Sequence, residues 1–140
     1  MIKNNIIGNT FLSLIYLCTF FILIVSITDV ARAADTPDLI IQDITWTPTT
    51  PSLGDTVTFT VAIMNQGNGS SSSGYAHFYL DGSTSPLTYK SFTAIDAGGS
   101  TTTVSFTWNA QAGSHTFKAV VDKDNKITES DETNNEKTIT

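Results

Sequence analysis

The chain has 140 residues, a formal net charge of −6 and a single cysteine, Cys18. Residues 34–140 hold 5 of its 7 basic and 12 of its 13 acidic residues, an excess of acid that argues against binding to nucleic acid or to an anionic membrane surface. The lack of a cysteine after residue 33 excludes a disulfide, a thiolate metal site and a cysteine nucleophile from that part.

Residues 1–33 have the pattern of an export leader. Lys3 and the amino terminus give a positive start, residues 4–28 carry no charge, and residues 11–27 are almost wholly apolar. Ala31 and Ala33 form the small-x-small pattern that precedes signal-peptidase cleavage, so we predict a signal peptide over 1–33. The alternative is an uncleaved N-terminal membrane anchor, because the uncharged stretch is long enough to cross a bilayer. In the first case the protein is secreted or lies at the extracellular cell surface.

The remaining chain alternates apolar and polar residues, with period 2, in short runs. This alternation is typical of strands with one buried face and one wet face. We expect strands at 38–46, 56–63, 75–80, about 87–95, 103–108, 115–121 and about 136–140, and no helix. The apolar phase slips by one residue between Ile41 and Ile44, which a β-bulge would explain.

Turn and loop signals separate these runs. Gly54-Asp55, Asp81-Gly82 and Gly98-Gly99 are turn dipeptides, and Gly67–Gly74 is expected to be a flexible loop. Seven short strands in about 105 residues predict an all-β fold, a seven-stranded antiparallel immunoglobulin-like sandwich preceded by a hydrophobic signal segment. With no disulfide, packing alone must hold the core, and Trp46 and Trp108 are expected to be its largest members.

Several motifs match one known pattern over residues 38–140. They are Trp46, Pro48 and Gly54-Asp55-Thr56-Val57 near the start, Asn65-x-Gly67 and Val104-x-Phe106-x-Trp108 in the middle, and Asp124-Asn125-x-Ile127-x-Glu129-Ser130-x-Glu132-x-Asn134-Asn135 at the close. In these motifs the chain resembles the CARDB domain, the cell adhesion related domain found in bacteria. The resemblance implies an immunoglobulin-like fold in a secreted or surface protein of bacteria or archaea, with a role in adhesion or as a spacer.

The acidic stretch 122–136 contains a candidate metal site. Its carboxylates Asp122, Asp124, Glu129 and Glu132 are hard oxygen ligands that would suit calcium. The spacing does not match an EF-hand loop. The alternative is a structured loop between the last two strands, in which the same side chains accept hydrogen bonds from backbone N–H groups.

A second candidate site is aromatic. If Ala76 and Phe78 face the core, Tyr75, His77 and Tyr79 share the outer face of their strand, and Tyr89 follows on a neighbouring strand. Exposed rings of this kind could contact a sugar or another protein. The alternative is that they are ordinary strand residues, since tyrosine is common on sheet surfaces.

The sequence contains none of the common catalytic motifs, such as G-x-S-x-G, H-E-x-x-H or a phosphate-binding loop. We therefore predict a non-catalytic binding or adhesion module without a required cofactor, whose partner is a cell-envelope protein or glycan. A carbohydrate-binding module using the aromatic residues and a calcium-stabilised structural domain remain the alternatives. No nucleic-acid partner is expected, and membrane contact is expected only if the leader is uncleaved.

Overall fold

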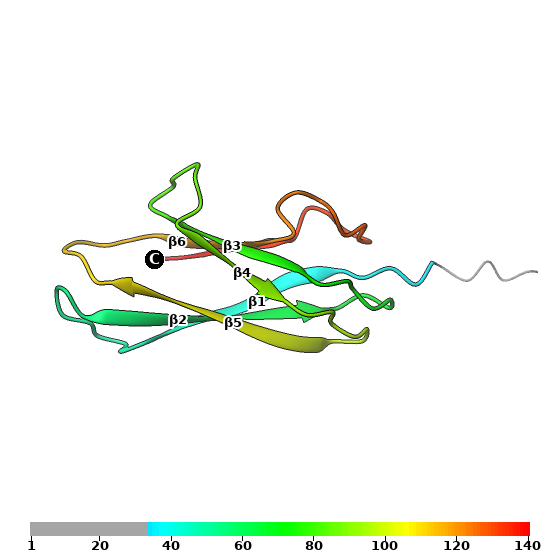
Figure 1. Cartoon of the computed structure of the whole chain (residues 1–140), viewed down its shortest axis with the longest axis horizontal. Helices are drawn as coiled ribbons and strands as arrows, with labels where there is room; N and C mark the ends of the chain where they lie inside the picture. The colour runs from blue at the N-terminus through cyan, green and yellow to red at the C-terminus, as the bar shows by residue number, and fades with distance from the viewer. Residues whose placement is uncertain (1–33) are drawn as a thin grey trace, which may run out of the picture. The chain divides into compact units, whose positions relative to one another are not determined.

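The computed structural model describes residues 34–140, so the predicted leader and its cleavage site lie outside the described residues. The described part is all-β: two antiparallel sheets face each other as two layers (Figure 1). Within residues 34–140 no helix is long and apolar enough to cross a membrane. The expected fold class, a seven-stranded immunoglobulin-like sandwich, is confirmed.

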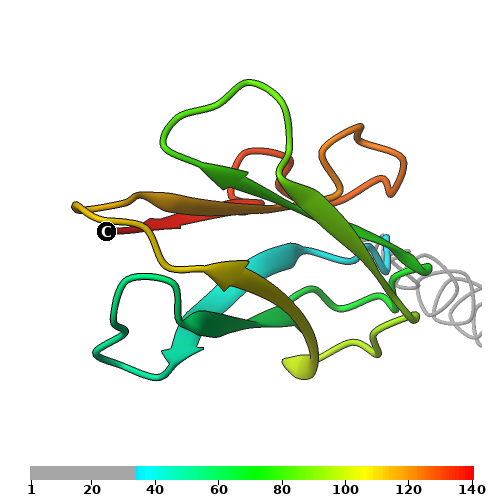
Figure 2. The same cartoon turned by 60° about the vertical axis from the view of Figure 1, so that its left-hand side comes forward.

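The strands follow the predicted runs closely. A three-stranded sheet has the order β1-β2-β5, and a four-stranded sheet has the order β4-β3-β6-β7. The strand bounds are β1 Leu39–Thr47, β2 Thr56–Asn65, β3 Gly74–Leu80, β4 Thr88–Phe92, β5 Ser100–Asn109, β6 Phe117–Val121 and β7 Glu136–Ile139. All pairings are antiparallel, and Figure 2 shows the loop between β3 and β4 standing away from the sandwich.

The predicted bulge in β1 is present. Ile41 pairs with Ile63, but the next pair is Asp43 with Ala62, so β1 carries one residue more than β2 at this point. The extra residue returns the apolar side chains to the inner face, and both Ile41 and Ile44 are buried. The apparent fault in the alternation is therefore what keeps both Ile41 and Ile44 on the inner face of β1.

Four phenylalanines form the centre of the core. The ring centroids of Phe59 and Phe117 lie 4.0 Å apart, those of Phe78 and Phe106 lie 4.2 Å apart, and those of Phe59 and Phe106 lie 5.1 Å apart. The pairs join both sheets, since Phe59 and Phe106 belong to one and Phe78 and Phe117 to the other. Truncating a buried ring of this size typically costs about 3–5 kcal/mol.

The two tryptophans are not the centre of the core. Trp46 is 37% exposed, so the expectation that it would be a core residue was wrong. Trp108 is partly buried and packs against the core. Both rings line a cavity of about 300 Å³ together with Phe59, Phe117 and Ile139. The alternation of apolar and polar residues predicted the correct face for both tryptophans. It does not show that this part of the sandwich is open.

The Gly67–Gly74 segment is not a free flexible loop. Gly69 N–H donates to Thr36 O at 3.0 Å, and Ser71 N–H donates to Ile95 O at 2.9 Å. Gly69 lies so close to the start of the described chain that a Cβ there would come within 2.2 Å of Asp35 O. Glycine is therefore required for contact between two backbones, and the expectation of flexibility was wrong.

Candidate functional site

Three of the four predicted aromatic residues form one exposed patch on the four-stranded sheet. Tyr75 and His77 lie on β3, and Tyr89 lies on β4 directly opposite His77. Tyr75 is 51% and Tyr89 is 59% exposed. The ring centroid of Tyr89 lies 5.6 Å from that of Tyr75 and 5.7 Å from that of His77. We call Tyr75, His77 and Tyr89 the aromatic face.

Tyr79 does not belong to the aromatic face, so its prediction as a residue of this site was wrong. It is only 6% exposed, although it has the same phase in β3 as Tyr75 and His77. Lys118 on the neighbouring strand β6 pairs with Tyr79, and the Lys118 ammonium lies 5.3 Å from the centre of the Tyr79 ring. A long side chain on a neighbouring strand can cover an outward-facing ring, and the alternation of a single strand does not reveal this.

A small cavity of about 110 Å³ adjoins the aromatic face. Tyr75 and His77 line it together with Lys123, Asp124 and Lys126 from the turn after β6. Burial is the main cause that lowers the pKa of His77, and the two lysines lower it further against the opposing effect of Asp124. His77 Nδ1 is buried without a hydrogen-bond partner among the described residues. The cavity therefore adds charged and polar groups beside the two tyrosine rings.

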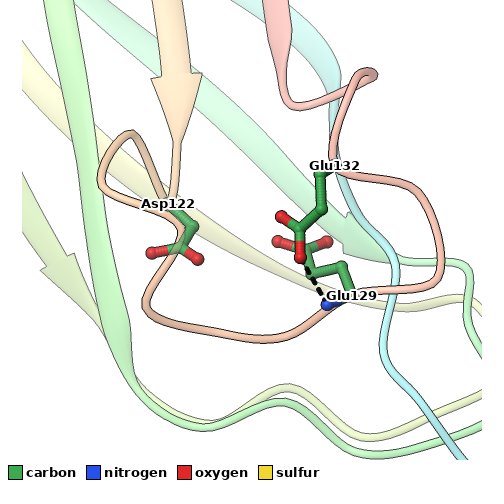
Figure 3. Close-up of side chains that lie close together, drawn as sticks. All are labelled: Asp122, Glu129 and Glu132. Atoms are coloured by element: carbon green, nitrogen blue, oxygen red, sulfur yellow. Dashed lines mark hydrogen bonds between the residues drawn. The ribbon is translucent and has the colours of Figure 1, made fainter.

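The structure gathers three of the four predicted metal ligands. Asp122, Glu129 and Glu132 direct their carboxylates toward one another (Figure 3), and one oxygen from each lies within 4.8 Å of the others. Asp124 is apart from this carboxylate cluster, contrary to its place in the predicted set, and forms ion pairs with its lysine neighbours instead. Asp122 has a positive φ of 45°, so the backbone reverses direction between the two aspartates.

Each carboxylate of the cluster already accepts a backbone hydrogen bond. Asp122 accepts from Lys126 N at 3.2 Å and from Ile127 N at 2.7 Å, closing the turn after β6. Glu132 accepts from Glu129 N at 2.8 Å, as Figure 3 shows. These bonds account for the acidic pattern without an ion, as the structured-loop alternative requires.

The same loop binds the beginning of β1. Glu129 accepts a hydrogen bond from Leu39 N, and Asn135 Nδ2 donates both to Leu39 O and to the Glu129 carboxylate at 2.9 Å. Ser130 N donates to Pro37 O at 2.9 Å. Asn134 Nδ2 donates to Asp38 Oδ1 at 2.8 Å. We call these four residues, Glu129, Ser130, Asn134 and Asn135, the clasp.

The sequence did not show what the clasp holds, because its partners lie about 90 positions earlier in the chain. The only signal was the closing motif itself, which contains all four residues. The structure therefore gives the closing motif a structural role, because its residues hold the beginning of β1.

Glu129 is the most strongly perturbed acid among the described residues. It is buried, and desolvation raises its pKa to about 7, against the lowering effect of the hydrogen bonds from Leu39 and Asn135. The negative charges of Glu132 and Asp122 act in the same direction as burial. A carboxyl with this pKa carries a proton in part of the molecules near neutral pH.

Comparison with known proteins gives a consistent family. The chain shares 30% identity with a solved domain of a Methanosarcina acetivorans protein named for the cell surface, with a TM-score of 0.60 over 74% of this chain and 88% of that chain. A Geobacter metallireducens structure is 28% identical, with a TM-score of 0.55 over 69% and 88%. A Pyrococcus furiosus CARDB domain, solved in complex with di-metal ions, is 20% identical, with a TM-score of 0.64 over 76% and 93%.

No curated protein matches the chain. The family comparison is decisive, because CARDB matches residues 36–139, which include all seven strands and the whole clasp. The chain therefore belongs to the CARDB family of cell-adhesion-related, non-catalytic immunoglobulin-like domains.

Proposed function

We propose that the protein is an exported binding module that acts at the cell envelope, and that its aromatic face contacts a protein partner. The observation that carries the proposal is the pair of half-exposed tyrosines, Tyr75 and Tyr89, in contact on two hydrogen-bonded strands. Rings on paired strands are already ordered, so binding costs them little conformational entropy. The cell-surface name of the Methanosarcina relative supports the location.

The ring geometry supports a protein partner over a glycan. The planes of Tyr75 and Tyr89 meet at 82°, an edge-to-face arrangement, so they do not form one flat platform on which successive sugar rings could stack. The adjoining cavity offers both signs of charge, through Lys123, Asp124 and Lys126, which suits the mixed polar rim of a protein interface. A glycan partner remains the alternative for the same face.

The double substitution Tyr75→Ala with Tyr89→Ala tests the face. We expect it to abolish capture of envelope proteins from the producing organism while the Tm changes little, because both rings are largely exposed. Leu53→Ala is the matched control, since Leu53 is an exposed apolar residue outside the face. Unchanged capture by the double variant would contradict the proposal. Loss of glycan-array binding with intact protein capture would favour the glycan alternative.

Export predicts a defined mature end. If the leader is a signal peptide, secreted material should begin at Ala34, because cleavage is expected after Ala33. Intact-mass measurement or N-terminal sequencing of protein from the medium checks this. Full-length chain found only in membranes would instead identify residues 1–33 as an anchor.

Calcium is expected to change the thermal stability little. The cluster oxygens already accept backbone hydrogen bonds, and a cation would have to displace the proton that Glu129 carries in part of the molecules. Melting scans with calcium and with a chelator measure the effect. The metal-bound Pyrococcus domain makes the opposite outcome worth testing. True binding would add about 2.7 kcal/mol at a hundredfold excess over Kd. A rise of several degrees that disappears in Asp122→Asn would overturn this expectation.

A further inference from the structure

The cavity beside the two tryptophans opens between the sheets, where β1 ends and β2 begins. It has a volume of about 300 Å³, and Trp46 and Trp108, the two tryptophans of the chain, both line it. Phe59 also lines it and is only 3% exposed, so the cavity reaches the core. Phe117 and Ile139 bring the four-stranded sheet into the lining. We call this space the tryptophan cavity.

Ring contacts hold one wall of the tryptophan cavity in place. The Trp108 ring meets the Phe117 ring at 79°, with centroids 5.2 Å apart, and meets the His115 ring at 67°, with centroids 5.1 Å apart. His115 Nδ1 in turn lies 2.8 Å from Asp81 Oδ2, which fixes the orientation of the imidazole. The domain's own residues therefore order this wall, and ligand sites are usually formed in advance in this way.

The same wall contains a buried polar atom without a partner. His115 Nε2 makes no hydrogen bond within the described part of the chain. The hydrogen bonds from Thr116 N and His115 lower the pKa of Asp81, so its carboxylate is ionised and only accepts. In the neutral imidazole Nδ1 is then the donor, and Nε2 is left as an acceptor.

We propose that the tryptophan cavity binds a small, uncharged aromatic molecule that carries one N–H or O–H donor, such as indole or a naphthol. Three properties of the lining select this class. An apolar cavity of about 150 Å³ accepts benzene, so twice that volume suits two fused rings. Aromatic walls favour a flat aromatic ligand, because stacked and edge-to-face contacts add to the effect of burial. The donor would satisfy His115 Nε2.

Charge excludes the ionised relatives of these compounds. No Asp, Glu, Lys or Arg lines the tryptophan cavity, so a charged ligand would lose its hydration without gaining a partner of opposite charge. The site is also distinct from the aromatic face, since neither Tyr75 nor Tyr89 lines it. Binding here is therefore independent of the function proposed for that face.

The two tryptophans provide a specific reporter for this site. We would titrate unlabelled indole into ¹⁵N-labelled protein beginning at Ala34, since residues 34–140 contain both sheets and their core. Both tryptophan side-chain N–H resonances should shift and saturate, with a Kd below about 1 mM, an affinity that so small a ligand allows. The amides of Tyr75 and Tyr89 should not shift.

Matched ligands test the chemistry without any change to the protein. Benzofuran has the shape of indole but no N–H, so it should bind at least about tenfold more weakly. Indole-3-carboxylate carries a charge and should leave the tryptophan resonances unchanged. Equal Kd values for indole and benzofuran, or tryptophan resonances that do not move with indole up to about 1 mM, would overturn the proposal.

Trp46→Ala tests the place of binding. Trp46 is 37% exposed, so the domain should still fold, and indole should bind at least about tenfold more weakly when followed at the Trp108 resonance. Leu87→Ala is the control, since Leu87 is an exposed apolar residue outside the tryptophan cavity, and it should keep the wild-type Kd. An unchanged Kd in Trp46→Ala would contradict the proposal. Tryptophan shifts caused by an envelope protein and not by indole would assign the cavity to a protein side chain instead.

Discussion

Asn65→Ala should destabilise the domain by about 3–5 kcal/mol, the largest effect expected of any polar substitution in it. Asn65 is completely buried, and its side chain makes four hydrogen bonds. Its Oδ1 accepts from Asp38 N at 3.0 Å and from Gly67 N at 3.1 Å. Its Nδ2 donates to Gly69 O at 2.8 Å and to Ile95 O at 3.0 Å.

The loss follows from the backbone groups that alanine would leave without a partner. Ile95 O keeps its bond from Ser71 N, but the other three groups lose the partner described here. Gly69 O is buried and the N–H groups of Asp38 and Gly67 are partly buried. Leaving a buried group unpaired costs about 1–3 kcal/mol, so the loss is a large share of the stability of a domain of this size. Urea unfolding of Asn65→Ala and of Asn68→Ala, an exposed residue with one bond to Thr36 N, measures the difference. Equal midpoints would show that the network around Asn65 contributes little.

Glu129→Gln should remove a pH dependence of stability from the domain. The pKa of Glu129 is raised from 4.5 to about 7, so the folded state binds this proton more tightly than the unfolded state does. The stabilisation is complete below pH 4.5 and is lost as the pH rises through about 7. A shift of this size corresponds to about 3 kcal/mol. The free energy of unfolding of the glutamine variant should therefore increase relative to that of the wild type as the pH rises from 4.5 to 8.

The comparison between the two proteins isolates Glu129. His77 has a lowered pKa and contributes stability of the opposite sign, which increases as the pH rises toward 6.5, but it does so in both proteins. Glu132→Gln is the matched control and should keep most of the pH dependence, because burial is the main cause of the Glu129 shift. Parallel stability profiles for the wild type and Glu129→Gln would contradict the prediction.

The strands could be predicted because each depends on local alternation. The run from Thr56 to Ile63 and the slipped phase of β1 both specify an inner face, and the structure confirms them. Trp46 and Tyr79 were misplaced for one reason: alternation gives a side chain's face and says nothing about what covers it. Trp46 borders an open cavity, and Lys118 lies over Tyr79.

The candidate sites could be predicted in part, because neighbours along a strand stay neighbours in space. Tyr75 and His77 share a face for that reason, and Tyr89 was expected nearby. The turn after β6 is different, because its backbone enters the left-handed region at Asp122 and Asn125 and separates Asp122 from Asp124. The partner of Glu129 could not be predicted at all, because Leu39 N is a backbone group whose position depends on the complete fold.

The position of the clasp has a mechanical consequence. In Figure 1 the described chain enters the sandwich beside the loop that carries the clasp and ends at the opposite side. A pull on the two ends of the domain therefore runs along the strands. Interstrand hydrogen bonds lie across that direction, so they resist together in shear rather than opening one after another. The bonds from Glu129 and Asn135 to Leu39 therefore carry the load at the point where it enters β1.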